Sequence, residues 1–452
     1  MRTVRRLGVL LITLSGVTPA ASVFIMGQQV IAEAGTGAFL SFIAAALLGL
    51  ATAYVYAELS SAFPVAGGEY SIIGRTVGPS WGFMALGLNL VGGGLGQAVT
   101  ALGLAAYLQV VLPGAPALPT ALAATLGTTL ITVLNIRVNA LITGLFLGVE
   151  LLAIGVLTGL GVLHAQRPLL ELVTHPVMIG VGGALAPASL AAIGMATAAA
   201  IYAYNGYGGA VFFGEEMHEA RTHMAWVVFW SLAIAVIAEL APISAVLVGA
   251  GDLKSLLSAA EPLPAFVGRV GGPWLAKAVS LGVAFAIVNA MIAIGLINAR
   301  QLYCSARDKA WPASVNRALA AIHPRFNSPW VATLAMGVLT AASCLLDLKL
   351  LVMLTANGLV MIYAGVSVAA IAGRTNGSTA GGAYRMPFFP LAPAVSLFAL
   401  AAVAVADLMD PQTGRPSLIA NLAVMALFAA YWAFYLRRRG GWALTGADGE
   451  VL

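Results

Sequence analysis

The stretch that decides the fold is residues 16–22, Gly-Val-Thr-Pro-Ala-Ala-Ser, in the middle of an apolar run from residue 8 to residue 32. Pro19 has no backbone N–H, and its ring clashes with the helical turn before it, so a helix through this run should break there. Because proline suits the first turn of a helix, a second half-helix should begin near Ala20. The free N–H groups at such a start favour an anion, for example a carboxylate. We therefore expect a helix break that can hold an acidic group of a ligand.

A second stretch of similar character is residues 204–209, Tyr-Asn-Gly-Tyr-Gly-Gly, inside the apolar run 189–214. Its three glycines weaken the helical preference of the backbone. At membrane depth, unwound backbone is tolerated only where it is buried in protein or lines a water-filled cavity. Two breaks therefore predict one shared cavity. The alternative is that the proline and the glycines only kink the helices or let them pack closely.

The composition requires a membrane environment. Of the 452 residues, 60% are hydrophobic and 9% are charged, whereas soluble domains carry about 25% charged residues. Such a chain cannot build a water-exposed surface, so we expect an all-α polytopic membrane protein embedded in the lipid bilayer. Twelve apolar ranges have about the length of a membrane-crossing helix, namely 8–32, 37–63, 81–112, 118–136, 140–163, 189–214, 225–250, 274–303, 329–346, 350–373, 390–407 and 417–436.

The two interrupted runs occupy matching places in this series. They are the first members of two sets of five helices, and an odd number of helices per set inverts the second set relative to the first. Interrupted helices at corresponding positions of two halves indicate the central site of a transporter. We expect a five-plus-five inverted repeat with two extra helices, divided into a first repeat over 1–163, a second repeat over 189–373, the extra helices over 390–437 and a short cytoplasmic tail over 438–452.

The distribution of charge predicts the orientation. With the N-terminus inside, the cytoplasmic segments receive most of the 22 lysine and arginine residues, which is the bias that sets membrane topology. Both termini should then be cytoplasmic, in a plasma (inner) membrane. The net charge of +5 reflects this topology and an attraction to anionic lipid, and the arginines are too scattered to bind nucleic acid. Residues 2–22 also resemble a signal peptide, but the apolar run continues to about Ala32, which is the length of a membrane span.

No motif indicates an enzyme, a cofactor or a metal site. Cys304 and Cys344 show no paired or metal-ligand spacing, and we expect both to serve in packing. Residues 78–82 spell G-x-S-x-G but lack the strand that must precede a hydrolase nucleophile. His218 and His223 are five residues apart, whereas two zinc ligands on one helix face are four apart. We therefore expect no cofactor and no catalysis.

Three groups of residues resemble one family of membrane proteins. Residues 57–70, Ala-Glu-Leu-Ser-Ser-Ala-Phe-Pro-Val-Ala-Gly-Gly-Glu-Tyr, closely resemble the AELSSxxPxAGGEY block of the amino acid, polyamine and organocation (APC) superfamily of permeases. Residues 203–216 resemble its AYxGF segment that ends in paired glutamates, and residues 300–312 resemble its loop after helix 8. The resemblance implies a leucine-transporter fold. It also implies amino acids, polyamines or related amines as substrates, exchanged or carried with a proton or a sodium ion.

The breaks and the resemblance together give the candidate substrate-binding residues. Residues 20–22 match the break whose N–H groups hold a substrate carboxylate in the family, although its glycines are replaced here by Ala-Ala-Ser. Tyr202, Ala203 and Asn205 match positions whose carbonyl groups receive the substrate's amino group. Gly208 stands where many members have a glutamate, which disfavours polyamines. The full set is Thr18, Pro19, Ala20, Ala21, Ser22, Tyr202, Ala203, Tyr204, Asn205, Gly206, Tyr207 and Gly208.

Some polar residues within apolar runs have two interpretations each. A charge at the depth of Glu150 costs roughly 2.5–3.5 kcal/mol on insertion scales, so this acid should be neutral or paired. Either Glu150 and Asn289 couple a proton or cation to transport, or Glu150 is a neutral acid bonded to a neighbouring helix. For Glu239, shortly before Pro242, we expect a structural hydrogen bond, and the alternative is a role in transport. Tyr204 and Tyr207 either gate the cavity or simply pack beside it.

These patterns predict a secondary active transporter of amino acids or related small amines that works by alternating access. It would be an ion-coupled symporter or exchanger, with a proton or a sodium ion as the coupling ion. The alternatives are a permease for polyamines or other organic amines, and a channel or solute sensor built on the same fold. The substrate, the direction of transport and the oligomeric state do not follow from the sequence.

Overall fold

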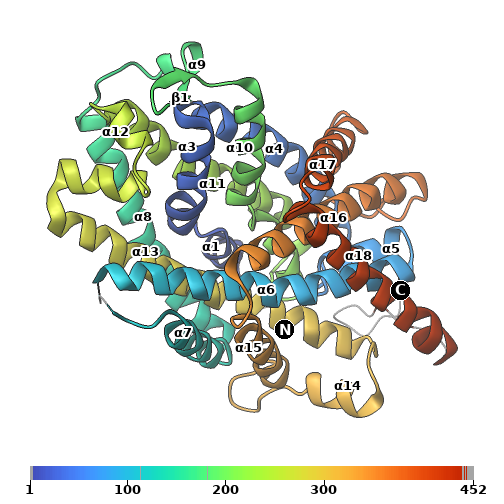
Figure 1. Cartoon of the computed structure of the whole chain (residues 1–452). Helices are drawn as coiled ribbons and strands as arrows, with labels where there is room; N and C mark the ends of the chain where they lie inside the picture. The colour runs from blue at the N-terminus through green and yellow to red at the C-terminus, as the bar shows by residue number, and fades with distance from the viewer. Residues whose placement is uncertain (1–3, 112–113, 181, 440–441, 443, 445–452) are drawn as a thin grey trace.

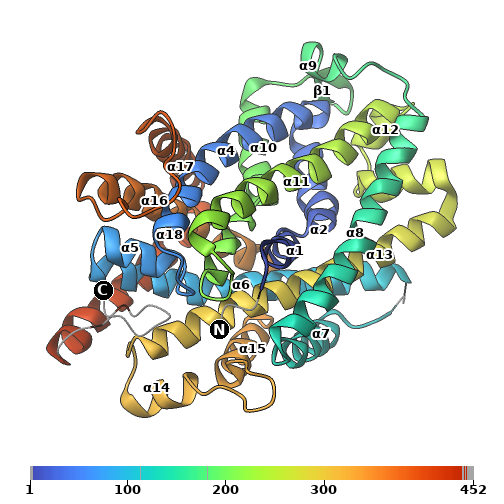
Figure 2. The same cartoon turned by 180° about the vertical axis from the view of Figure 1, so that it is seen from behind.

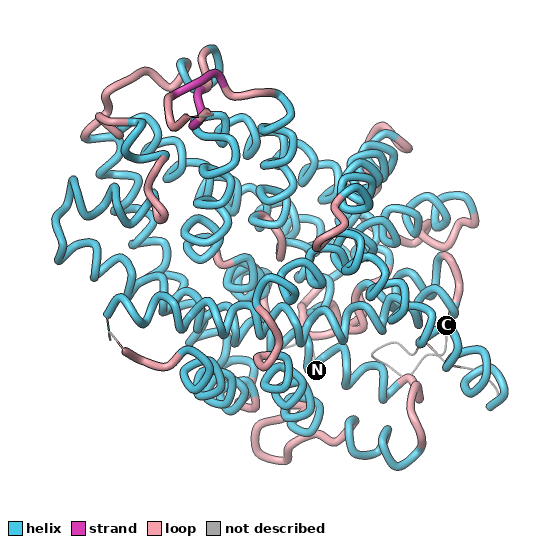
Figure 3. The backbone as a smooth tube through the Cα atoms, in the orientation of Figure 1, coloured by secondary structure: helices cyan, strands magenta, loops and turns pink. Residues whose placement is uncertain are grey.

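The computed structural model of the chain describes residues 4–111, 114–180, 182–439, 442 and 444. This part is nearly all helical and includes one small hairpin (Figure 3), in which β1 (Val177–Ile179) pairs antiparallel with β2 (Leu185–Pro187). Of the expected tail over 438–452, residues 438, 439, 442 and 444 are described. The other tail residues and residues 1–3 lie outside the described residues. The cytoplasmic placement of the two termini therefore stays a prediction.

The first apolar run is broken where the proline predicts. The helix before it ends at Thr18, whose backbone is left-handed with φ 51° and ψ 65°, and Pro19 opens the next helix. A β-branched residue at positive φ is strained, which marks a place where the surroundings hold the chain against its preference. The predicted break is thus confirmed. The successive segments are α1 (Arg6–Val17), α2 (Pro19–Ser22), the π-helical turn η1 (Val23–Gly27) and α3 (Gln28–Ala34).

The second break is also present and touches the first. The helix α10 (Leu190–Ala203) stops before Gly206, where φ is 115°, and a 3₁₀ helix η3 (Tyr207–Phe213) follows. Only glycine readily adopts that φ. A Cβ atom added at Gly206 would lie 2.9 Å from the backbone of Val17 in α1. Glycine is therefore required both by the turn and by the close approach of the two breaks.

The other expected ranges also contain helix. The helix expected at 274–303 begins earlier and is kinked at Gly272, where φ is 82°. The long helices are α4 (Ala38–Ala62), α6 (Pro79–Val111), α7 (Ala117–Thr132), α8 (Ile136–Leu163), α11 (Ala220–Gly249), α13 (Pro262–Arg307), α15 (Trp330–Ser343), α16 (Leu348–Thr375), α17 (Leu391–Met409) and α18 (Gly414–Tyr431). The short ones are η2 (Gly35–Gly37), α5 (Glu69–Thr76), α9 (Glu171–Thr174), α12 (Leu253–Leu257), α14 (Ala313–Leu319), η4 (Trp432–Leu436) and η5 (Arg437–Arg439).

The broken helices occupy the middle of the molecule. α1 packs against α8, α11, α13 and η3, so protein surrounds the first break (Figures 1 and 2). α6 and α13 cross this centre and pack on each other. α17 and α18 pack on each other and on α16, at one side of the molecule (Figure 1). The centre therefore joins segments from the two expected repeats, and the two extra helices lie outside it.

The outer surface is apolar. Large side chains such as Leu152, Leu163 and Phe398 are exposed by 68%, 80% and 79%, which water disfavours and lipid tolerates. In the described part of the chain, eight helical stretches are long and apolar enough to cross a membrane, and two shorter apolar helices accompany them. The protein is therefore a multi-pass membrane protein. The number of twelve crossings stays a prediction.

Candidate functional site

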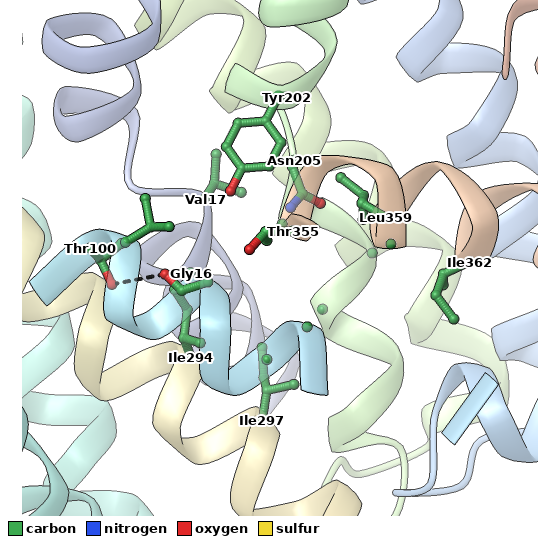
Figure 4. Close-up of a pocket in the computed structure, with 18 of the residues that line it drawn as sticks. Gly16, Val17, Thr100, Tyr202, Asn205, Ile294, Ile297, Thr355, Leu359 and Ile362 are labelled. Carbon is green, nitrogen blue, oxygen red and sulfur yellow. Dashed lines mark hydrogen bonds between the residues drawn. The ribbon is translucent and has the colours of Figure 1, made fainter. Parts of the chain in front are cut away.

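The two breaks, together with residues of α5, α6, α13 and α16, line one partly open cavity of about 260 Å³. Figure 4 shows Tyr202 and Asn205 on one side of it, and Ile294 and Ile297 of α13 on the opposite side. Its volume is near the lower end of the roughly 300–1,000 Å³ typical of ligand pockets, and its largely apolar wall with a few polar groups is also typical of them. The candidate residues that line it are Thr18, Ala21, Ser22, Tyr202, Ala203, Asn205, Gly206 and Gly208.

A serine side chain links the two breaks at the cavity wall. The Ser22 hydroxyl group lies 3.0 Å from the carbonyl oxygen of Ala203 and 3.2 Å from that of Val17, and it donates to them. Carbonyl groups at the ends of α1 and α10 are therefore bridged by one side chain of α2. The bridge fixes the distance between the two unwound segments on which a solute would rest.

Four candidate residues do not line the cavity. Pro19 and Ala20 are buried on another side of α2. The ring of Tyr204 packs edge-on against Phe42, and the ring of Tyr207 packs edge-on against Tyr56. In this structure both tyrosines therefore pack behind the wall.

The backbone N–H of Ala20 has a partner from the chain itself. It donates a 2.8 Å hydrogen bond to Oε1 of Glu150 on α8. The amide of Asn289 on α13 faces the same carboxyl group, although it lies outside hydrogen-bond geometry in this conformation. The structure thus brings the two candidate coupling residues together behind the first break. Neither of them lines the cavity.

Glu239 differs from the sequence-based expectation. Neither of its carboxyl oxygens has a hydrogen-bond partner among the described residues, although its side chain is fully buried. The predicted structural hydrogen bond is therefore wrong for this conformation. The acid lies on α11 within electrostatic range of Glu150. Periodicity placed it in an apolar run but gave no sign of this neighbour on another helix.

A carboxyl group in the cavity wall was missed by the sequence reasoning. Glu69, at the start of α5, accepts hydrogen bonds from the hydroxyl group of Tyr56 and from the Asn89 amide, the latter at 3.0 Å. Glu69 and Asn89 both line the cavity. The acid belongs to the AELSSxxPxAGGEY-like block, but it opens the short helix α5 directly after the loop that follows α4, where no helical periodicity marks a wall position. Only the folding of that loop against α6 brings it there.

Other polar side chains join the wall to its surroundings. The Tyr363 hydroxyl group donates a 2.7 Å hydrogen bond to Oδ1 of Asn205, which ties the second break to α16. On α6, Gln97 donates to the carbonyl oxygen of Met291 at 3.0 Å. Its own oxygen accepts from Asn298 at 3.4 Å, and Asn298 lines the cavity. These bonds hold the wall helices in a fixed arrangement.

The motif blocks that carry the family resemblance meet around ion pairs. The guanidinium group of Arg374 holds both carboxyl oxygens of Glu58, with donor–acceptor distances of 2.5 and 2.7 Å. Arg307 holds Glu215 at 2.6 and 2.8 Å. The third pair, formed by Arg300 and Glu216, has its shortest distance at 2.9 Å. Contacts made through two hydrogen bonds are geometrically specific. These pairs therefore fix how α4 is joined to α16 and how the segment after η3 is joined to α13.

A multi-pass helical membrane protein with one cavity between two broken helices has the architecture of a solute transporter. Residues 6–429 match the amino acid permease family. The chain therefore belongs to the amino acid permease family, which confirms the resemblance to APC-superfamily permeases. It is a transporter and not an enzyme.

Several relatives are similar over most of their length. A branched-chain amino acid permease of Bacillus subtilis is 24% identical over 412 residues, covering 87% of this chain and 86% of the relative. A methylthioribose transporter of the same organism is 25% identical over 391 residues, covering 82% and 81%. An uncharacterized transporter of Mycobacterium tuberculosis is 28% identical over 384 residues, covering 81% and 80%.

Proposed function

We propose that the protein is a secondary active transporter of small neutral amino acids that works by alternating access. The observation that carries this function is the cavity of about 260 Å³ with both helix breaks in its wall. Membership of the amino acid permease family supports the class of solute. Two similar relatives named as branched-chain amino acid permeases support an aliphatic side chain.

We propose that the amino and carboxyl groups of the solute bind at the unwound backbone. Ala21 and Ser22 of the first break and residues 202–208 of the second supply polar backbone groups there. The aliphatic side chain would rest among apolar residues of α13 and α16, including Ile294, Ile297 and Leu359. This division is favourable because apolar burial and a few oriented polar groups together define small-molecule sites.

We propose the inverted repeat as the framework for alternating access. The breaks lie at α1–α2 and α10–η3, the first helices of the ranges 1–163 and 189–373, as such a repeat requires. The range 390–437 contains α17 and α18, which pack beside α16. In this arrangement the twelve helices would cross a plasma membrane with both termini in the cytoplasm.

We propose a proton as the coupling ion, in a symporter or an exchanger, with Glu150 and Asn289 at the coupling site. Glu150 is fully buried, makes no ion pair among the described residues and bonds directly to the first break. A change in its protonation would therefore act on the backbone of α2. Sodium is the alternative ion.

A more cationic amine is the second candidate substrate, and Glu69 is the observation that favours it. Its carboxyl group lies in the cavity wall, where it could oppose an additional positive charge on the solute. Two donors already hold this carboxyl group, from Tyr56 and Asn89, which is why we rank the neutral amino acid first. The screen below includes both classes.

The test is counterflow in proteoliposomes made with the purified protein. Vesicles loaded with unlabelled leucine, valine, lysine or putrescine are diluted into the same solute carrying a radiolabel. The proposal expects saturable accumulation for leucine or valine that depends on the internal solute. Accumulation of lysine or putrescine alone supports the second candidate, and flux that is insensitive to internal solute indicates a channel. Absence of counterflow with all four solutes would overturn both proposals.

A further inference from the structure

A group of buried polar side chains lies behind the first break, apart from the cavity. It consists of Glu150 on α8, Glu239 on α11 and Asn289 on α13, all with no exposed surface. None of them lines the cavity. The short helix α2 packs against all three of these helices. The group therefore surrounds the segment that starts directly after the break.

The apolar contacts of Ala20 show where the group lies relative to α2. Ala20 packs with Ile154 of α8 and Ala286 of α13, and Ala238 of α11 lies against this cluster. Each neighbour is adjacent to, or about one helical turn from, one of the three polar residues. The three polar side chains thus come from the helix turns that enclose Ala20.

Most polar atoms of the group have no partner. Oε1 of Glu150 accepts from the Ala20 N–H. In the described part of the chain, Oε2 of Glu150, both carboxyl oxygens of Glu239 and both amide atoms of Asn289 have none. Fully buried polar atoms without partners are rare in native proteins, and each requires an explanation. Here five of them occur around one turn of helix.

The group also lacks a compensating positive charge. No lysine, arginine or histidine among the described residues forms an ion pair with either carboxyl group. Within the described ranges, the only other titratable group near the pair is the Tyr204 hydroxyl group, which comes from the second break and also lacks a hydrogen-bond partner there. α2 and η1 contain no titratable residue, and α13 presents the uncharged Asn289. Two buried like charges that share a site repel each other strongly, so both carboxyl groups can ionise only if a cation binds or if they move apart.

We propose that Glu150 and Glu239 form a binding site for one proton and that Asn289 positions the pair. The inference rests on the proposed function, because it names the residues that would couple a proton gradient to transport. In the loaded state the proton sits on the Glu239 carboxyl group, which donates it to Oε2 of Glu150, while Oε1 of Glu150 keeps the Ala20 N–H. When the proton leaves to solvent, both carboxylates are charged, and their repulsion displaces Glu150 and the start of α2. Proton release is thereby linked to the position of the first break.

A proton fits this site better than a metal cation. A sodium ion would need several oxygen ligands arranged around one point, whereas the electrostatic neighbours here follow one another from Tyr204 to Glu239, then to Glu150 and Asn289. No group of three or more acidic, histidine or cysteine side chains that could hold a metal occurs among the described residues. A proton shared between neighbouring oxygens requires only such a chain.

The test compares Glu239→Gln and Glu150→Gln with Glu33→Gln, an acid of α3 outside the pair. The solute is the amino acid that wild-type protein exchanges in counterflow. For wild-type protein and Glu33→Gln, an inward proton gradient should stimulate uptake about tenfold, within the range of roughly 5- to 150-fold typical of coupled sites. Either pair variant should lose this stimulation, and Glu239→Gln should keep counterflow within about threefold. Glu239→Asp, which keeps a carboxyl group, should retain part of the stimulation and serves if the glutamine variant fails to fold.

A spectroscopic measurement reads the proton directly. Infrared difference spectra between high and low pH should show the C=O band of a buried protonated carboxyl group, and this band should be missing in Glu239→Gln. The proposal is overturned if Glu239→Gln keeps full proton stimulation, as expected when only water fills the site, or if a sodium gradient drives wild-type uptake and a proton gradient does not. Wild-type counterflow without proton stimulation would reject the inference alone, whereas absence of counterflow would reject the proposed function.

Discussion

The N–H of Ala20 and the carboxyl group of Glu150 are joined by a 2.8 Å hydrogen bond across two helices. In the family pattern, the matching N–H groups receive a substrate carboxylate. Here the Ala20 N–H is occupied by an acid of the chain itself, and the Ser22 N–H donates to the carbonyl oxygen of Thr18 at 2.9 Å. In the proposed binding mode, the backbone of Ala21, which lines the cavity, would receive the substrate carboxylate. The first break therefore faces solute on one side and an acid on the other.

We predict that Ser22→Ala weakens substrate binding. The variant removes the hydroxyl group that bridges the carbonyl oxygens of Ala203 and Val17. Because one hydrogen bond contributes about 0.5–1.5 kcal/mol net, the apparent Kd should rise about 2- to 12-fold. Isothermal titration calorimetry with the exchanged amino acid measures this. Ser244→Ala is the control, since that hydroxyl group bonds to Leu240 within its own helix. Equal affinities of the Ser22 variant and wild-type protein would contradict the prediction.

We predict that Gly92→Leu abolishes binding by filling the cavity. A Cβ atom at Gly92 meets nothing within 4 Å, and this glycine is part of the cavity wall. Its leucine side chain would therefore occupy the space of the solute without clashing with protein. Gly127→Leu is the matched control, because its Cβ atom is equally free and lies on an exposed part of α7. Counterflow should disappear only in the first variant, and normal counterflow there would show that solute binds elsewhere.

We predict that Tyr363→Phe slows transport. Its hydroxyl group anchors Asn205 at 2.7 Å, so the variant releases the second break from α16. The loss should be about tenfold in kcat/KM, as for one hydrogen bond of about 1.4 kcal/mol. Tyr54→Phe, whose ring packs against Phe229, is the control. Initial rates of uptake measure this effect. A Tyr363→Phe variant that transports as fast as the control would show that the hydrogen bond to Asn205 does not affect transport.

We predict that Arg374→Ala strongly destabilises the fold. It leaves the Glu58 side chain, which is 1% exposed, without its ionic partner, and breaking a buried pair costs about 3–5 kcal/mol. Thermal unfolding in detergent should show a clearly lower Tm than for Arg317→Ala, which removes an exposed arginine of α14. The double variant Glu58→Met/Arg374→Met should recover part of the loss. If the single and double variants unfold alike, the pair is not what stabilises this junction.

We predict that Asp410, in the loop between α17 and α18, makes a small, pH-dependent contribution to the stability of the fold. Hydrogen bonds from the Thr413 hydroxyl group and from the N–H groups of Gln412 and Gly414 lower the pKa of Asp410 to about 2. Because this pKa lies below the unfolded value of about 3.9, the carboxylate stabilises the fold above that value, and the stabilisation is lost as pH falls through about 2. Asp410→Asn should lower Tm at neutral pH, and the difference should shrink toward pH 2. A constant difference would contradict this cause.

The backbone breaks could be predicted from the sequence because covalent structure dictates them. Pro19 cannot continue a helix whatever surrounds it, and the glycines around 206 permit the φ of 115° found there. The apolar ranges likewise predicted where helices occur. The helix at 262–307 was longer than its apolar range, since Arg269 and the Gly-Gly-Pro run at 271–273 separate its first part from that range.

The contacts between helices could not be predicted in the same way. Periodicity shows that Glu150 and Glu239 lie in apolar runs, but it does not show that both lie on helices packed around α2. The place of Glu69 in the cavity wall depends on how one loop folds onto α6. Such relationships depend on tertiary packing between residues distant in sequence, which no local pattern records.

The approach of Gly206 to Val17 has a consequence for movement. A Cβ atom added at Gly206 would lie only 2.9 Å from the backbone of Val17. The two main chains are therefore in direct contact, with no side chain between them. A displacement of either segment should therefore displace the other, so we expect the two breaks to move together. In the proposed alternating access, opening toward one face of the membrane would therefore require the two broken helices to turn together.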